Sequence, residues 1–242
     1  MDWTAKAASW WNGRRIPEPE AMDGSDEVAA YAGAAAQRHL ARLDGLVARR
    51  AAGLAGSGTW AVDLGCGPAA IPLAVARLRP RLSVVAMDLS LPMLREGREQ
   101  ARRRRLAERI HFVCGSAAAL PLRSGRFDLV MSNSLLHHLH DPGRGLGEAV
   151  RVASGTGAVF IRDLRRPPRF WVSAHLALFG RHYTGAMRRL FDASVRAAYT
   201  CAEVRRLVAP LAGMKVRPRG GAYLEAERSR GWSGRSSHEP VA

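Results

Sequence analysis

Short apolar runs alternate with longer amphipathic segments from residue 59 onward. Runs of this kind are typical of buried strands, and they lie at 60–64, 82–87, 110–114, 127–131 and 158–161. The segments between them predict helices at 69–78, 91–106 and 145–152, the second with Ser90 as its N-cap. Because helices separate most of the strands, the pattern predicts crossover units and a mostly parallel sheet covered on both faces. The predicted fold class is α/β, doubly wound.

Two segments flank or interrupt this alternation. Residues 1–57 predict an N-terminal helical lead-in or lid, with Trp3, Trp10 and Trp11 as aromatic anchors. Residues 165–200 predict a helical insert inside the main domain, which we assign to residues 58–227.

The C-terminal part of the chain predicts a helix and two closing strands. Thr200 and Glu203 form a capping-box pattern that opens a helix to about residue 211. Short apolar runs at 214–216 and 222–224 predict a final strand pair, and residues 155–157 (Gly-Thr-Gly) predict a turn before the fifth strand. The last stretch, 228–242, is rich in Ser, Gly and Arg and predicts a disordered tail.

Composition excludes several classes of protein. The chain has 242 residues, of which 47% are hydrophobic and 24% are charged, so we expect one globular domain with appendages. No apolar run approaches the roughly 18 residues of a membrane-spanning helix, and the N-terminus lacks the features of a signal peptide. Cys66, Cys114 and Cys201 are too far apart for a CxxC pair. A cytoplasmic protein with reduced thiols is expected.

The formal net charge of +16 raises the possibility of a nucleic-acid partner. However, only two of the 37 basic residues, Lys6 and Lys215, are lysine, and the chain is rich in alanine. A coding sequence with strong GC bias would produce that combination without selection for RNA binding. The basic residues are also spread along the chain, so RNA is the less favoured partner.

The end of the first predicted strand carries a glycine-rich turn. Gly65 and Gly67 let the backbone turn sharply and approach a ligand closely. Asp88 ends the second strand, where a carboxylate can accept hydrogen bonds from both hydroxyls of a ribose. Ligands of doubly wound sheets bind at such strand ends. Alone, this pattern also fits a dinucleotide-binding turn, because Gly65, Gly67 and Ala70 satisfy the G-x-G-x-x-G/A spacing.

The later motifs distinguish between these options. Five segments follow in order, which are VDLGCGP at 62–68, VAMDLS at 85–90, VCGSA at 113–117, FDLV at 127–130 with LHHLHDP at 136–142, and IRDLRRP at 161–167. Through these segments the chain resembles the class I S-adenosylmethionine-dependent methyltransferases over about residues 59–168. Residues 15–20 with Met22 and Asp23 also resemble the lead-in of the ubiquinone/menaquinone type. The resemblance implies a seven-stranded Rossmann-like sheet and S-adenosyl-L-methionine as the cofactor.

The resemblance also implies roles for individual residues. Gly65, Cys66 and Gly67 would lie under the methionine portion, with Asp63 orienting its amino group. Asp88 would bind the ribose hydroxyls. The remaining cofactor contacts implied by the resemblance are Leu89 and Met93 at the adenine slot, Ser116 and Ala117 at the adenine edge, and Ser132 and Asn133 beside the methionine end.

The chain departs from the family pattern at two positions. Ser116 stands where many relatives have aspartate, which removes a charge-assisted hydrogen bond worth about 1 kcal/mol. Ala69 replaces the third glycine of the first motif and is expected to narrow the pocket by one methyl group. Both changes predict weaker cofactor binding, and a cofactor-binding protein without activity remains an alternative.

Methyl transfer to a nucleophile needs approach geometry first and a base only when the acceptor is protonated. His138 is the predicted base, with a packing role as the alternative. His137, His138 and His140 fit no usual zinc spacing, so no metal is expected. Asp163 is expected to border the acceptor cavity or to pair with a neighbouring arginine.

The helical insert is expected to select the acceptor, because it follows the strand ends. It carries an aromatic set that would form an apolar wall, namely Phe170, Trp171, Phe179, Tyr183 and Phe191. The favoured function is methyl transfer to a small-molecule acceptor by a monomer or homodimer. The alternatives are an RNA methyltransferase, an inactive scaffold, and a nicotinamide oxidoreductase, for which no Tyr-xxx-Lys pair is present.

Overall fold

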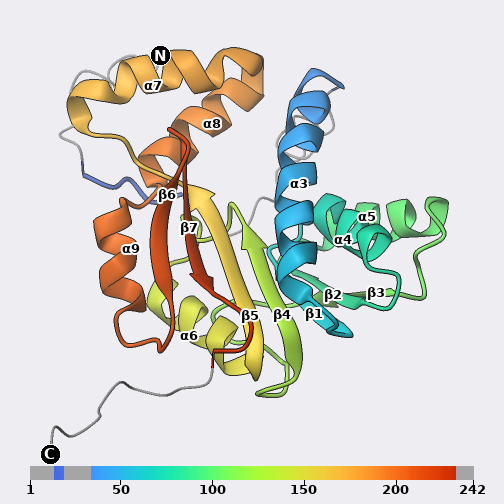
Figure 1. Ribbon diagram of the computed structural model, residues 1–242. Helices are drawn as coiled ribbons and strands as arrows, with labels where there is room; N and C mark the ends of the chain where they lie inside the picture. Colours follow the sequence, from blue (N-terminus) through green and yellow to red (C-terminus); the bar gives the residue numbers. More distant parts are fainter. Residues whose placement is uncertain (1–13, 19–33, 233–242) are drawn as a thin grey trace, which may run out of the picture.

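A seven-stranded sheet forms the centre of the protein in a computed structural model that describes residues 14–18 and 34–232 (Figure 1). The strand order is β3-β2-β1-β4-β5-β7-β6. The strands are β1 (Trp60–Leu64), β2 (Ser83–Asp88), β3 (Ile110–Cys114), β4 (Phe127–Asn133), β5 (Ala153–Leu164), β6 (Lys215–Arg219) and β7 (Tyr223–Arg228).

Strand direction brings the chemically important ends to one edge. β1 to β5 pair in parallel, whereas β7 is antiparallel to both β5 and β6. The carboxyl ends of β1, β2, β4 and β5 therefore share an edge with the start of β7, where Tyr223 is opposite Leu164. The strand order reverses between β1 and β4, which is where such sheets bind ligands.

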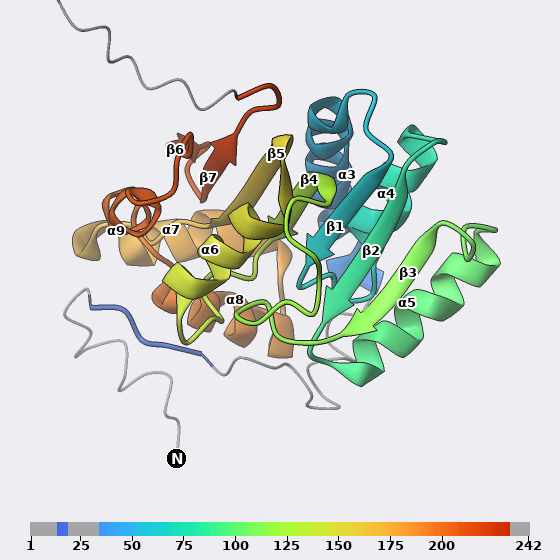
Figure 2. The same cartoon turned by 90° about the horizontal axis from the view of Figure 1, so that it is seen from below.

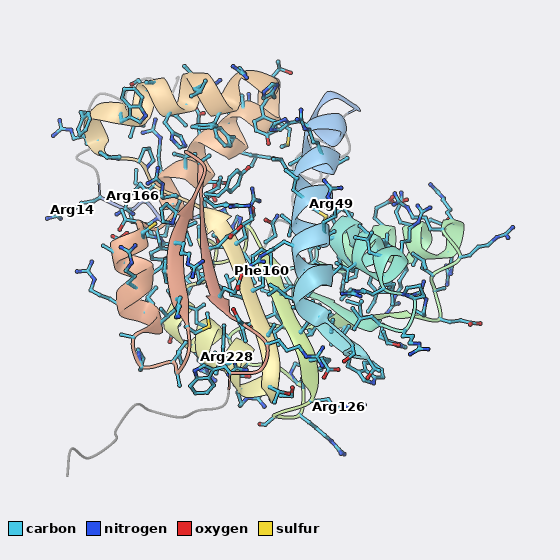
Figure 3. The ribbon with its side chains drawn as sticks, viewed as in Figure 1. Arg14, Arg49, Arg126, Phe160, Arg166 and Arg228 are labelled. Carbon is cyan, nitrogen blue, oxygen red and sulfur yellow. The ribbon has the colours of Figure 1, made fainter. Side chains whose placement is uncertain are left out.

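Helices cover both faces of the sheet, as Figure 2 shows. One face packs against α3 (Ala34–Ala55), α4 (Ala70–Leu78) and α5 (Leu91–Arg103) through a buried apolar cluster. The opposite face packs against α6 (Pro142–Val152) and α9 (Cys201–Val208) through a second cluster. Figure 3 shows Phe160, which is fully buried, on the first face between β7 and α3.

The insert packs above the carboxyl ends of β4 and β5 (Figure 1). It consists of η1 (Arg169–Trp171), α7 (Val172–Phe179), η2 (Gly180–His182) and α8 (Gly185–Ala197). A third apolar cluster joins these helices to Leu164 at the end of β5, with Leu40 of α3 and Tyr223 of β7 against it. The insert therefore forms a roof over the edge where the strand ends meet.

The predicted architecture is confirmed, including the helical insert and the antiparallel closing pair. The Ser90 cap is present, since its side chain accepts from Met93 N–H. The predicted turn at residues 155–157 is wrong, because β5 begins at Ala153 and runs through it. The pairing register shifts between Phe127 and Leu129, so the extra residues of β5 bulge without ending the strand.

The tail prediction is wrong for its first residues. β7 extends to Arg228, whose buried guanidinium donates to the carbonyl oxygens of Ser154 and Gly157. Residues 233–242 lie outside the described part of the chain, as does most of the lead-in outside α3 and residues 14–18. Among the helices that the structure describes, none combines the length and apolar character needed to cross a membrane.

Candidate functional site

A tight loop follows β1 and is held by the end of β2. The N–H groups of Gly65 and Cys66 both donate to the carbonyl oxygen of Met87, at 2.8 and 2.9 Å. Gly65 and Gly67 have φ of 71° and 52°, in the left-handed region that glycine tolerates. A Cβ at Gly67 would meet no atom within 4 Å, so the loop presents open space at this residue.

Asp88 joins this loop to β2. Its Oδ2 accepts from Gly67 N–H at 2.8 Å, and its Oδ1 accepts from Ser90 N–H at 2.9 Å. The carboxylate is half-buried, and each oxygen keeps a lone pair for a further donor. The sequence predicted the glycine turn and the carboxylate at two strand ends, and the structure shows that Gly67 and Asp88 are in direct contact.

Asp63 is buried beneath this loop, with 2% of its surface exposed. Burial raises its pKa well above the ordinary value, and the neighbouring Asp88 and Asp44 raise it further. Burial likewise raises the pKa of the Cys66 thiol, so this cysteine is no nucleophile at neutral pH. A cation near Asp63 would be needed to favour its ionised form.

The other predicted cofactor residues lie around the same edge. Leu89 and Met93 follow β2 at the start of α5, and Met93 is buried. Ser116 Oγ accepts from Ala118 N–H, so the hydroxyl that replaces the family's carboxylate caps its own turn. The Ala117 side chain packs into the apolar cluster beneath α6, which leaves its backbone as the available contact.

Ala69 corrects an expectation. Its side chain is fully buried, and a Cβ at Gly97 of α5 would approach the Ala69 methyl to 3.1 Å. The methyl group therefore fills the interface between the loop and α5 and does not narrow a ligand slot. Its φ of 63° lies in the left-handed region that favours glycine.

The ends of β4 and β5 are tied by a polar group around Arg162. Ser132 Oγ donates to Leu64 O at 2.8 Å, which joins β4 to β1. Asn133 Oδ1 accepts from Arg162 Nη1 at 2.9 Å, and the Arg162 guanidinium stacks 3.5 Å from the centre of the Tyr223 ring. Burial raises the pKa of nearby Asp44 to about 6, although the Arg162 charge lowers it.

A buried histidine pair with two carboxylates lies after β4. His137 Nδ1 is 2.5 Å from Asp163 Oδ1, and both side chains are almost fully buried. Glu18 Oε2 lies 3.7 Å from His137 Nε2 and 3.9 Å from His138 Nδ1. The two carboxylates raise the pKa of His137 against the effect of burial. Asp163 thus pairs with His137, and not with the neighbouring arginine that the sequence suggested.

Glu18 belongs to the short segment 14–18, which crosses this site. Arg15 donates to the carbonyl oxygens of His137 and Ala197, both at 2.6 Å. Ser194 of α8 donates to the Glu18 carboxylate. The segment therefore connects the histidine pair to α8.

Glu18, His137 and His138 are also the group of side chains most able to hold a metal among the described residues. Their ligand atoms lie within 4.8 Å of one another. Bonds of about 2.1 Å would bring neighbouring ligand atoms closer together than this, and Ser194 already donates to Glu18. The geometry favours charge pairing of His137 over metal binding.

A cavity of about 480 Å³ opens between α3, the insert and the β6–β7 turn. Phe179, Tyr183 and Phe191 line it, which confirms part of the predicted aromatic wall. Phe170 and Trp171 do not, since they are 88% and 52% exposed. Phe191 lines the cavity and Ser194 binds Glu18 one turn later, so α8 links the cavity to the histidine pair.

Sequence reasoning missed Asp44, Arg162 and Tyr223. Asp44 and Tyr223 lie far from the family motifs, and their meeting with Arg162 depends on tertiary packing. Arg162 precedes Asp163 in the fifth motif. The sequence could have indicated a role for Arg162 only through strand alternation, in which adjacent side chains point to opposite faces of the sheet.

Comparison with known families agrees with this arrangement. Residues 62–161 match the family described as "Methyltransferase domain". The chain is 33% identical over 103 residues to the malonyl-[acyl-carrier protein] O-methyltransferase of Legionella pneumophila, covering 43% of this chain and 35% of that protein. It is 33% identical over 82 residues to the ubiquinone/menaquinone biosynthesis C-methyltransferase UbiE of a Ruegeria species, covering 34% of this chain and 33% of that protein.

A solved structure extends the likeness to the whole fold. The plantazolicin methyltransferase BpumL in complex with SAH superposes with a TM-score of 0.67 and 12% identity, covering 85% of this chain and 91% of that one. At a sequence identity of 12%, this likeness shows the fold alone. The chain spans about a third of the length of the two relatives named above.

Proposed function

We propose that this chain, whose residues 62–161 match the methyltransferase domain family, is a class I methyltransferase that transfers a methyl group from S-adenosylmethionine to a small-molecule acceptor. The observation that carries this proposal is the loop after β1, held by Asp88 and open at Gly67. The N–H groups of Gly65, Cys66 and Gly67 already have partners within the protein, yet the loop leaves space where a Cβ of residue 67 would stand.

The residues present suit this cofactor. Asp88 has lone pairs for two ribose hydroxyls while it holds Gly67 and Ser90. Asp63 is a buried acid whose raised pKa a bound ammonium group would lower. When bound, S-adenosylmethionine supplies an electrophilic methyl group on a sulfonium.

The acceptor site is proposed to be the cavity between α3 and the insert. Its volume of about 480 Å³ lies within the range of small-molecule sites, and aromatic side chains form much of its wall. Arg162 lines this cavity and binds Asn133 at the end of β4, beside the cofactor loop. The cavity therefore leads toward the strand ends that hold the cofactor in this fold.

His137 is proposed as the base for a protonated acceptor. Asp163 on Nδ1 fixes the ring and leaves Nε2 as the atom that takes a proton. Glu18 lies 3.7 Å from Nε2, so an acceptor hydroxyl would replace Glu18 at this atom. His138, the residue that the sequence favoured, stays the alternative base, with a side chain that is 12% exposed.

The proposal is tested by methyl transfer from tritiated S-adenosylmethionine. The purified chain is incubated with a panel of phenols, quinols and carboxylic acids, and in parallel with total RNA. Transfer of label to a small acceptor, lost in Asp88→Asn and retained in Asp192→Asn, supports the proposal. Labelling of RNA alone would make the acceptor assignment wrong, and cofactor binding without any transfer would favour a scaffold.

A further inference from the structure

The cavity has apolar walls and one basic end. Leu43 and Leu46 of α3 and Phe179 and Phe191 of the insert form the walls, and the fully buried Phe160 lies beneath them. Figure 3 shows Phe160 on the sheet face between α3 and β7. Flat aromatic surfaces of this kind suit a ring system of one or two fused rings.

The basic end is formed by His39 of α3 with Arg181 and His182 of η2, all of which line the cavity. The rings of His39 and His182 stack with their centres 4.3 Å apart. Arg181 Nε donates to His182 Nε2 at 3.2 Å. Burial lowers the pKa of His39, and the electrostatic interactions with His182, Arg42 and Arg181 lower it further.

Within residues 14–18 and 34–232, the charge at this end has no acidic counterpart, unlike the other cations of the cavity. Arg50 pairs with Glu227 at 2.6 Å, and Arg219 is 3.6 Å from Glu225. Arg162 has Asn133 as a partner and Asp44 nearby. Among the ion pairs of the described residues, none joins His39, Arg181 or His182 to a carboxylate.

From this distribution we propose that the acceptor is an aromatic molecule with an anionic group, which binds at His39, Arg181 and His182. The apolar walls take the ring system, and the other end of the molecule points to Arg162 and Asn133. This inference rests on the proposed function, because it names the class of acceptor for the same cavity. An arginine and two imidazoles that have no acidic partner in the described part of the chain provide several donors for a carboxylate.

The inference is tested with 2-naphthoate and its neutral analogue 2-naphthamide as probes, by titration calorimetry at pH 7.0. We expect the carboxylate to bind about tenfold more tightly than the amide, the effect of one charge-assisted hydrogen bond. In Arg181→Gln the Kd of 2-naphthoate should rise about tenfold while that of 2-naphthamide stays unchanged. The matched control is Arg189→Gln on α8, exposed and not part of the cavity wall.

Equal binding of the two probes, with no change in Arg181→Gln, would overturn the inference. His182→Gln serves as a second variant, with the same selective loss expected for 2-naphthoate. S-adenosylhomocysteine is titrated against the same proteins to separate the two proposals. Selective naphthoate binding without any S-adenosylhomocysteine binding would leave the anion site standing and remove the proposed methyl transfer; the reverse result would keep the proposed function and reject the anion site.

Discussion

Asp44 lies on α3 near Arg162 and is the ionisable residue with the clearest effect on stability. Burial raises its pKa to about 6 from an ordinary value of 3.8. Because the folded state holds the proton more tightly than the unfolded chain, the free energy of unfolding falls as the pH rises from about 4 to about 6. Asp44→Asn should therefore raise the free energy of unfolding at pH 7.5 by about 1 to 3 kcal/mol, with no gain at pH 4.

Urea denaturation at pH 4 and pH 7.5 measures this difference. Asp192→Asn is the control, since Asp192 forms an ion pair with Arg188 at a third of its surface exposed. An Asp44→Asn variant that is less stable than the wild type at pH 7.5 would mean that the Arg162 charge outweighs burial.

Whether His137 or His138 acts as the base can be decided from the kcat of their variants and from the pH profile of the reaction. If His137 is the base, His137→Gln should lower kcat by about 100-fold or more for a hydroxyl acceptor, with little change in KM. His138→Gln should lower kcat much less. Asp163→Asn should also lower kcat, because a neutral amide does not stabilise the positive charge of the imidazolium that forms when His137 takes a proton. The rate of the wild type should rise with pH through the raised pKa of His137.

Steady-state kinetics over pH 5 to 9 with the acceptor found above tests this assignment. A larger loss in His138→Gln than in His137→Gln would return the role to His138. An acceptor that is methylated on a carboxylate is already ionised and needs no base. With such an acceptor we expect the rate to be independent of pH over this range.

The sequence predicted the residues of the cofactor loop better than those of the acceptor side. The apolar pattern locates the strand ends at which Gly67 and Asp88 lie, and the direct contact between them is known only from the structure. The methyl group of Ala69 points into the core, which depends on the packing of α5 and has no local signal. Phe170 and Trp171 were predicted to line the acceptor cavity because they are aromatic. Their exposure to solvent depends on how the backbone of the insert folds, which the residue type does not indicate.

At the scale of elements, α9 offers a direct test of helix capping. Thr200 and Glu203 form a reciprocal capping box, whereas Thr184 at the start of α8 makes no side-chain cap. Thr200→Ala should lower the free energy of unfolding by about 1 kcal/mol, and the matched Thr184→Ala by only a few tenths. Equal losses in urea denaturation would mean that the box contributes nothing beyond the helix propensity of its residues.

Element boundaries were predictable where local chemistry sets them. Ser90 and the capping box fix the starts of α5 and α9 through side-chain hydrogen bonds that the sequence displays. The start of β5 was missed because residues 155–157 are typical of a turn, yet Arg228 of β7 binds the carbonyl oxygens of Ser154 and Gly157. A partner 71 residues away has no signal in the local pattern.

At the scale of the whole molecule, the net charge of +16 comes in part from arginines that hold the fold together. These side chains donate hydrogen bonds to backbone carbonyl oxygens of the protein itself. Arg79 donates to Ala52 O, Arg109 to Ala76 O and Arg166 to Ala198 O, so each satisfies a carbonyl near a helix end. Arg166 and Arg126, labelled in Figure 3, lie near opposite ends of the parallel strands β5 and β4. These arginines are therefore spread over the molecule.

RNA binding is accordingly expected to be weak and non-specific. The affinity for a single-stranded RNA such as poly(U) should fall steeply between 50 and 200 mM salt, because counterion release dominates contacts of this kind. Fluorescence anisotropy measures it. S-adenosylhomocysteine binding should not change when RNA is present, and cooperative binding of the two would contradict the small-molecule assignment.

The central claim is that the loop after β1 and Asp88 form a cofactor site, and titration calorimetry with S-adenosylhomocysteine tests it most directly. The account predicts saturable binding to the wild type and to Asp192→Asn. It predicts an affinity lower by about 100-fold in Asp88→Asn, which loses a charged acceptor for the ribose hydroxyls. Absence of binding to the wild type, or equal binding to Asp88→Asn, would contradict the account.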